Sequence, residues 1–200
     1  MHVSDGILTS EVTITSAVIA VGLLIYSFKD LKNKNIAIVS AMSAVFFIAS
    51  FVHIPLGFVQ IHLVLIGIIG IILGAQVFLA IFIALLLQAT LLGYGGISSL
   101  GANLIIMSLP AYLIFLASKT GLLNFFSSKI KYFMIGFLAV LLSSLFLALT
   151  LALSKEEYLY ASYTIILANV PAMFIEGLIT LFLINYLKKS IPEILDEAKI

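Results

Sequence analysis

The most constraining feature of this sequence is a long stretch without a formal charge. No Asp, Glu, Lys or Arg occurs from Asn35 to Ser118, and 63% of all residues are hydrophobic. One bilayer crossing needs about 20 apolar residues, so this stretch predicts several crossings. The apolar runs are continuous, which indicates helices rather than the alternating strands of a β-barrel. We therefore predict an all-α polytopic protein of the cell membrane, with a single transmembrane domain over residues 1–200.

Composition excludes several other classes of protein. The chain has no cysteine, which excludes disulfides and thiolate metal sites, and its net charge of +1 argues against a nucleic-acid partner. Its first ten residues carry Asp5 and no lysine, so the first apolar segment is expected to be a retained span rather than a signal peptide. Met1 is expected to be the mature terminus, because the bulky His2 hinders removal of the initiator methionine.

The order of the apolar segments predicts the topology. They lie at about 12–28, 36–52, 62–92, 100–118, 132–153 and 159–187. A single helix over 62–92 would be about 46 Å long, against about 30 Å of hydrocarbon, so it either tilts steeply or folds at Gly74–Gln76 into spans 62–74 and 76–92. Folding is favoured because, with the N-terminus outside, every lysine except Lys155 then faces the cytoplasm. The prediction is seven transmembrane helices, N-terminus outside and C-terminus inside, with Pro171 kinking or starting the last helix.

This topology gathers the three histidines at the outer face. The α-amine of Met1, the backbone nitrogen of residue 2 and Nδ1 of His2 can close two chelate rings in nearly one plane. A fourth nitrogen from His53 or His62 would complete the square that Ni(II) and Cu(II) favour. Each histidine alone is better read as an ordinary interfacial residue, and only their convergence favours a metal site.

Four polar residues are candidates to support such ligands. Gln88 and Asn103 are amides inside apolar spans, and buried amides need hydrogen-bond partners. They either orient a metal ligand or join helices. Glu176 lies well inside a span, where a packing or ligand-supporting role is favoured over a proton relay. Asp5 is a further candidate beside the amino terminus.

Glycines mark two other places in the sequence. The turn "GYGGISSLG" at 93–101 is predicted to be either a tight re-entrant turn with close backbone approach or a simple interhelical turn. Gly67, Gly70 and Gly74 recur at the spacing that lets helices approach closely; they either pack the bundle or dock a membrane partner, and packing is favoured.

Four segments resemble one known family. "MHVSDGIL" resembles the amino terminus of the substrate-binding membrane subunits of cobalt and nickel energy-coupling-factor transporters, the CbiM/NikM family. The segments "HLVLIGIIGIILGAQ", "LLLQATLLGYGGISSLGANLIIM" and "NVPAMFIEGLIT" are similar to later parts of the same family, in order. The resemblance implies the bundle of an energy-coupling-factor substrate-binding subunit with an additional N-terminal helix. It also implies a metal held by Met1, His2 and His62.

The resemblance further implies partners and cargo. The cargo would be Ni(II) or Co(II), with no resident cofactor. The partners would be a membrane coupling subunit, cytoplasmic ATPases and a small accessory membrane subunit. Two departures stand out: the family's Gly-Thr-Ser-Gly before the second histidine is "GFVQI" here, and its acidic residue in the glycine-rich turn is Tyr94. These departures keep His53 as an additional or substitute ligand.

Three functions compete at this point. The first is a metal-capture subunit, which is not itself an enzyme because the chain has no Walker motif. The second is a substrate-binding subunit for a small vitamin-like molecule, which would need an aromatic, apolar pocket. The third is a membrane metalloenzyme or haem anchor that uses His53, His62 and Glu176.

Overall fold

The computed structural model describes every residue except 1, 30, 32–34, 57–58 and 199, and only the backbone of the others within 53–61 and 196–198. Helices dominate the described chain, which confirms the predicted helical class. In chain order the elements are α1 (Ser10–Lys29), α2 (Ile36–Ala49), β1 (His53–Leu56), β2 (Val59–His62), α3 (Ile66–Leu73), η2 (Gly74–Gln76), α4 (Val77–Leu87), η3 (Gln88–Leu92), α5 (Leu100–Lys119), α6 (Ser128–Ser154), η4 (Glu156–Tyr158), α7 (Leu159–Ala168), α8 (Val170–Ser190) and η5 (Pro192–Ala198).

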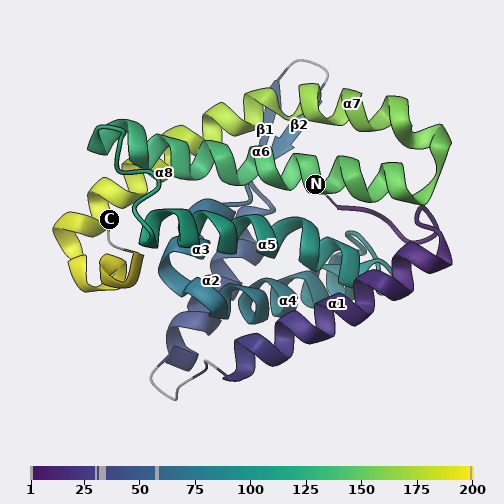
Figure 1. The fold of residues 1–200 in the computed structure, drawn as a ribbon, viewed down its shortest axis with the longest axis horizontal. Helices are drawn as coiled ribbons and strands as arrows, with labels where there is room; N and C mark the ends of the chain where they lie inside the picture. Colours follow the sequence, from purple (N-terminus) through teal and green to yellow (C-terminus); the bar gives the residue numbers. More distant parts are fainter. Residues whose placement is uncertain (1, 30, 32–34, 57–58, 199) are drawn as a thin grey trace.

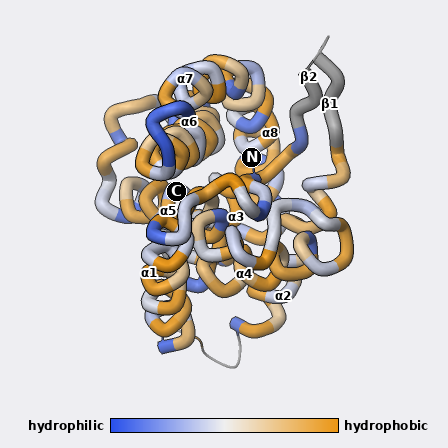
Figure 2. Tube along the Cα trace, turned by 90° about the vertical axis from the view of Figure 1, so that its right-hand side faces the viewer, coloured by the Kyte–Doolittle hydropathy of each residue, from blue (hydrophilic) through white to orange (hydrophobic). Residues whose placement is uncertain are grey.

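The helices form three layers. Helix α6 with α7 and α8 makes one outer layer, α3 and α5 lie in the middle, and α1, α2 and α4 make the other outer layer (Figure 1). Helix α5 packs against α1, α3, α4 and α6, so it is the central helix of the bundle. Hydrophobic residues run along most of the trace on the outer as well as the inner surfaces (Figure 2). That distribution fits helices whose outer faces contact lipid.

The apolar segment 62–92 breaks at Gly74–Gln76, as the sequence predicts. Gly74 has φ +54° and ψ −127°, which an L-residue adopts poorly, and a short 3₁₀ turn follows it. Up to the break, Gly70 lies against Ala111 and Gly74 against Phe115. After the break, Phe78 of α4 packs on Tyr112, with ring centroids 5.2 Å apart. The chain therefore reverses its direction along α5, and both halves of the segment pack on the same helix.

The last apolar segment also divides where proline predicts. Helix α7 ends at Ala168, and α8 begins at Val170 with Pro171 in its first turn. Proline suits that position, because the first N–H groups of a helix have no partner within the helix. The two helices together run back along the 27-residue helix α6 (Figure 1).

A short antiparallel hairpin, which the sequence did not indicate, follows α2. Strand β1 pairs with β2 in a register that sets His53 opposite His62 and Ile54 opposite Ile61. Pro55 lacks a backbone N–H, so a helix continuing from α2 could not pass through it. Helix α2 ends at Ala49, three residues before the predicted end of the second apolar segment at 52. The hairpin then places His62 shortly before the start of α3.

Five helical stretches of the described chain are long and apolar enough to cross a membrane. One of them joins α3 to η3, and another joins η4 to α8. Helix α3 has eight residues and rises only about 12 Å, which is less than the hydrocarbon thickness. The chain is a multi-pass membrane protein, while the seven spans and the orientation of the termini stay predictions.

Glycines bring α3 close to α5 and α6, and α6 close to α8, which confirms the expected packing role of Gly67 and Gly70. A Cβ on Gly67 would lie 2.8 Å from the carbonyl oxygen of Ile135, and one on Gly70 would lie 2.3 Å from that of Ala111. A Cβ on Gly136 would lie 2.4 Å from the carbonyl oxygen of Glu176. No larger residue fits these positions without moving a helix.

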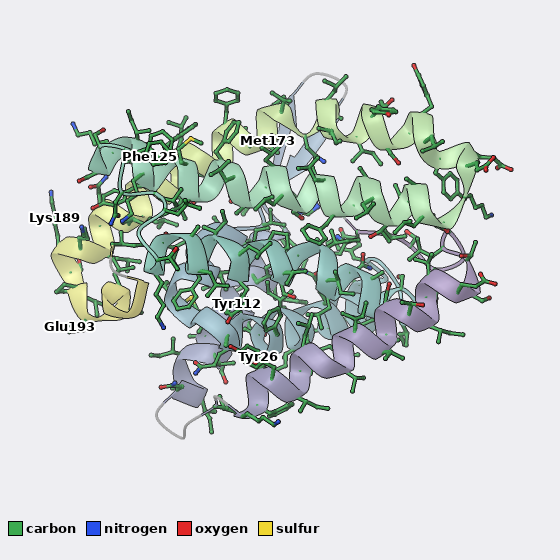
Figure 3. The ribbon with its side chains drawn as sticks, in the orientation of Figure 1. Tyr26, Tyr112, Phe125, Met173, Lys189 and Glu193 are labelled. Carbon is green, nitrogen blue, oxygen red and sulfur yellow. The ribbon has the colours of Figure 1, made fainter. Side chains whose placement is uncertain are left out.

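Helix α1 is the most peripheral of the long helices. Its side chains Ile14 and Val18 are 64% and 68% exposed, as expected for a lipid-facing surface. It is joined to the centre of the bundle near its C-terminal end, where the hydroxyls of Tyr26 and Tyr112 lie 2.8 Å apart (Figure 3). The N-terminal segment enters the site from the opposite end of α1.

Candidate metal site

The segment before α1 is held by an amide side chain of α5. The Val3 N–H donates to Oδ1 of Asn103 at 2.8 Å, and Nδ2 of Asn103 donates to the Val3 carbonyl at 2.9 Å. The hydroxyl of Ser99 donates to the same carbonyl at 2.8 Å. Val3 is buried, so these bonds supply the partners that its backbone groups would otherwise lack. Residue 3 is thus fixed at the N-terminal end of α5.

Asp5 adds a second contact between this segment and the start of α5. Its carboxylate accepts hydrogen bonds from the Ser98 hydroxyl at 2.6 Å, the Ile97 N–H at 3.2 Å and the Ser99 N–H at 3.1 Å. A helix N-terminus favours a negative charge. The hydrogen bond from the Ser98 hydroxyl, followed by those from Ser99 and Ile97, lowers the pKa of Asp5. Asp5 therefore holds the segment in place through α5.

His2 lies next to Gln88. Nε2 of His2 is 2.9 Å from Oε1 of Gln88. An amide oxygen only accepts, so Nε2 carries the proton, and Nδ1 of the neutral ring keeps its lone pair. Burial lowers the pKa of His2 to about 3, and His62 acts in the same direction. The His2 ring is therefore neutral near pH 7, with the nitrogen that the predicted chelate requires unprotonated.

Gln88 owes its position to a local change in helix type. Residues Gln88–Leu92 form one turn of π-helix at the end of α4, closed by Gly93 in the left-handed region. Such turns recur at functional sites. Gln88 is completely buried, and its Nε2 has no hydrogen-bond partner among the residues that the structure describes.

His62 faces His2 from the end of β2. The two imidazole centroids lie 5.6 Å apart, with an angle of 22° between the ring planes. Nδ1 of His62 lies 3.4 Å from the Leu63 carbonyl oxygen, a contact that favours a proton on Nδ1 and gives Nε2 the lone pair. His62 precedes α3 and Gln88 follows α4. The turn at Gly74–Gln76 between these two helices therefore brings both residues to His2.

A cavity of about 320 Å³ opens beside the two rings. Its lining consists of the two histidines, two serines, two glycines and one tyrosine: His2, Ser4, Ser50, His62, Gly93, Tyr94 and Gly95. Gly95 has φ +74°, and a Cβ there would lie 2.9 Å from Nδ2 of Asn103 and 3.7 Å from Cβ of His2. The glycine-rich turn is therefore a place of close backbone approach, which was one of its two predicted roles.

Two candidate ligands lie outside what the structure describes. Met1 is outside the described residues, and of His53 only the backbone is described, paired with His62 across the hairpin. Within the described part of the chain no group of three or more His, Cys, Asp and Glu side chains forms. The described ligand candidates are thus the pair His2 and His62.

Glu176 does not reach the imidazoles. Its carboxylate accepts hydrogen bonds from the backbone N–H of Val64, at 2.5 Å, and from that of Leu65, at 3.1 Å to both oxygens. It is almost completely buried. Both carboxylate oxygens are thus occupied by the backbone N–H groups two and three residues after His62. This geometry argues against Glu176 as a metal or haem ligand.

Known proteins resemble this chain over nearly its whole length. Residues 2–194 match the family described as cobalt uptake substrate-specific transmembrane region. A protein of Haemophilus influenzae named for metal transport is 28% identical, covering 100% of this chain and 98% of its own length. The cobalt transport protein CbiM of Kyrpidia tusciae is also 28% identical, covering 99% of this chain and 87% of its own length.

Solved structures share the fold. A transition metal transporter superposes with a TM-score of 0.80 at 22% identity, covering 94% of this chain and 93% of its own. A truncated transition metal transporter gives the same TM-score at 21% identity, covering 94% of this chain and 99% of its own. The chain therefore belongs to the family of cobalt uptake substrate-specific transmembrane regions, which are membrane components of metal transport and not enzymes.

Proposed function

We propose that this chain captures Ni(II) or Co(II) at the outer face of the membrane, as the substrate-binding subunit of an ATP-driven transporter of the energy-coupling-factor type. The cargo would be held by the imidazole and amide nitrogens of His2, by His62, and by the amine of Met1. A membrane coupling subunit and cytoplasmic ATPases, with a small accessory membrane subunit, would drive its release inward. The family membership supports metal transport, and the paired histidines support the site.

The observation that carries this proposal is the contact between His2 and His62. Residues 60 positions apart in the sequence bring two imidazoles to 5.6 Å in one cavity. Imidazole is a preferred ligand of Ni(II) and Co(II), and it binds in its neutral form. The hydrogen bond from Nε2 of His2 to Gln88 leaves Nδ1 for the metal, and outer partners of this kind commonly fix the tautomer of metal-binding histidines.

The lining of the cavity favours a metal over an organic substrate. Histidines, serines and glycines make up the lining apart from Tyr94. A vitamin-like substrate calls for a mainly apolar and aromatic pocket. Three or four nitrogen donors in one plane also select by geometry, since square-planar coordination suits Ni(II) and Cu(II) better than ions that prefer six oxygens.

The test uses purified protein with a native amino terminus. Isothermal titration with Ni(II) and Co(II) should give one site per chain for at least one of the ions. His2→Ala and His62→Ala should each weaken binding by at least tenfold, and a Gly-Ser extension before Met1 should abolish the terminal-amine contribution. Thermal melting in detergent should show that all three variants remain folded.

A His53→Ala variant decides which histidine is the second imidazole ligand. Retention of affinity in His53→Ala with loss in His62→Ala would support the proposed ligand set, and the reverse would replace His62 with His53. Equal metal binding by the extended chain would refute the terminal-amine ligand. A wild-type chain that binds neither ion would refute metal capture altogether.

A further inference from the structure

A buried carboxylate of α8 holds the backbone that directly follows His62. We propose that Glu176 is a positioning residue for the metal ligand His62, an inference that rests on the proposed function. Glu176 accepts from the Val64 N–H at 2.5 Å and from the Leu65 N–H at 3.1 Å. Only Leu63 separates this anchored pair from His62. Glu176 fixes the backbone that aims the imidazole, without touching the imidazole itself.

The backbone at this point needs an outside acceptor. Leu65 has φ +54°, the left-handed conformation that a branched side chain disfavours. Helix α3 begins directly after it, and no side chain of residue 65 caps that helix. Val64 and Leu65 are both buried, so their N–H groups have no access to water. A conformation of this kind persists only where the surroundings hold it, and the carboxylate of Glu176 holds it here.

The packing of three helices places Glu176 within reach. Gly67 of α3 lies against the backbone of Ile135 and Gly136, and Gly136 lies against the backbone of Glu176. The two glycines let α3 and α8 approach α6 from different sides without side chains between their backbones. The carboxylate then spans from α8 to the N–H groups of Val64 and Leu65, which directly precede α3, where the positive end of the helix dipole also favours a negative charge.

The consequence for metal binding follows from the loss of this acceptor. In Glu176→Gln the side chain keeps its shape and one accepting oxygen, but its NH₂ group replaces the other oxygen, which faces the donating N–H of Leu65. The segment 63–65 would then shift or lose its order, and His62 with it. Loss of a group that orients a metal-binding histidine typically lowers metal affinity by about 10- to 100-fold.

A matched variant separates this role from general packing. Thr180 lies one turn further along the same face of α8, is fully buried, and has a hydroxyl without a hydrogen-bond partner among the described residues. Thr180→Val therefore alters the same interface without touching residues 63–65. We expect Ni(II) titration to show about tenfold or greater weakening in Glu176→Gln and less than twofold in Thr180→Val, with similar thermal melting.

A double-variant cycle supplies the readout that a purely structural role would not give. In a His62→Ala background, Glu176→Gln should cost no more than about twofold in Ni(II) affinity, because the ligand that it positions is already gone. The visible absorption of bound Ni(II) should shift in Glu176→Gln toward that of His62→Ala, since both lose the same nitrogen. Hydrogen exchange at residues 63–66 should accelerate in Glu176→Gln.

The outcomes distinguish this inference from the proposed function. Wild-type metal binding together with unchanged affinity in Glu176→Gln would overturn the positioning role alone. Equal losses in the wild-type and His62→Ala backgrounds would also overturn it, because the effect would then not pass through His62. Absence of Ni(II) and Co(II) binding by the wild type would overturn the proposed function and the inference with it.

Discussion

The two segments that carry His2 and His62 are held in opposite ways. The N-terminal segment is attached by three uncharged side chains, Gln88 of η3, Ser99 just before α5 and Asn103 of α5, while Asp5 bonds to the residues that precede α5. The segment after His62 is held by one buried carboxylate, Glu176, which accepts from the N–H groups of Val64 and Leu65, and by a hydrogen bond from the Leu63 N–H to the Val52 carbonyl oxygen at 3.2 Å. A distributed attachment can be weakened in steps, whereas loss of Glu176 removes the acceptor of two backbone N–H groups at once.

Hydrogen–deuterium exchange over residues 3–9 and 62–69 can follow the two attachments separately. Each substitution below should alter exchange in the N-terminal peptide and leave the other peptide as a control. Measurements on metal-free protein isolate the attachment from the metal.

Acidification should give the largest effect on the N-terminal segment. Burial lowers the pKa of docked His2 to about 3 from 6.5. Between these values His2 of the undocked segment takes up a proton that the docked ring does not, so the neutral ring contributes fully to docking above pH 6.5, and docking weakens by about tenfold for each pH unit below it. Exchange of residues 3–9, corrected for its intrinsic pH dependence, should rise accordingly. A His2→Asn variant should lack this change, and a flat profile in the wild type between pH 7 and 5 would contradict the buried, neutral ring.

Asn103→Ala should come next, because it removes both hydrogen bonds to the buried backbone of Val3. Two bonds of about 1 kcal/mol each, or somewhat more for the groups left unpaired, correspond to about 30-fold weaker docking. Exchange of residues 3–9 and Ni(II) affinity should change together. Asn185→Ala is the matched control, since within the described chain that amide bonds only to Leu181 of its own helix. An Asn103→Ala chain with wild-type exchange would show that Ser99 and Asp5 suffice.

Gln88→Leu should have a smaller effect. It removes one hydrogen bond to His2, which is worth about 1 kcal/mol or about fivefold. It also removes a buried Nε2 that lacks a partner within the described chain, which offsets part of the loss. The His2 tautomer is then no longer fixed, so Ni(II) affinity should fall more than docking does. An equal fall in both would mean that Gln88 only anchors the segment.

Asp5→Asn should give the smallest effect, about twofold near neutral pH, because Asp5 is exposed to solvent. Its carboxylate has a lowered pKa, so its contribution to docking is present above its usual value of 3.8 and is lost as the pH falls below it. Below pH 4 the wild type should therefore lose an additional contribution that Asp5→Asn lacks. Added salt should weaken wild-type docking slightly more than that of the variant.

Much of this architecture could be predicted from local signals in the sequence. The reversal at Gly74–Gln76 followed from a segment too long for one upright crossing, from a glycine at its middle and from the placement of the lysines. The division before Pro171 followed from the missing N–H of proline. The convergence of His2 and His62 followed from the topology together with the family resemblance, while their role as metal ligands stays a prediction.

The remaining features depend on contacts between distant residues. The amides Gln88 and Asn103 were expected to need partners, but the partners, His2 and Val3, lie 86 and 100 positions away. The bond from Leu65 to Glu176 spans 111 positions, and its left-handed backbone has no signal in a run of aliphatic residues. The hairpin of β1 and β2 was missed because hydropathy marks residues 53–61 only as a connection between two apolar segments. Hydropathy indicates which residues lie inside the membrane, but it does not indicate which distant residues contact one another.

The close stacking of Gly67, Gly136 and Glu176 limits how related sequences can diverge. Lipid-facing positions such as Val18 can exchange one aliphatic side chain for another at little cost, because acyl chains adapt to either shape. Gly67 and Gly136 have no such freedom, since even a methyl group there would collide with a neighbouring main chain. Across diverged relatives, these two positions should retain glycine, while the lipid-facing positions should vary.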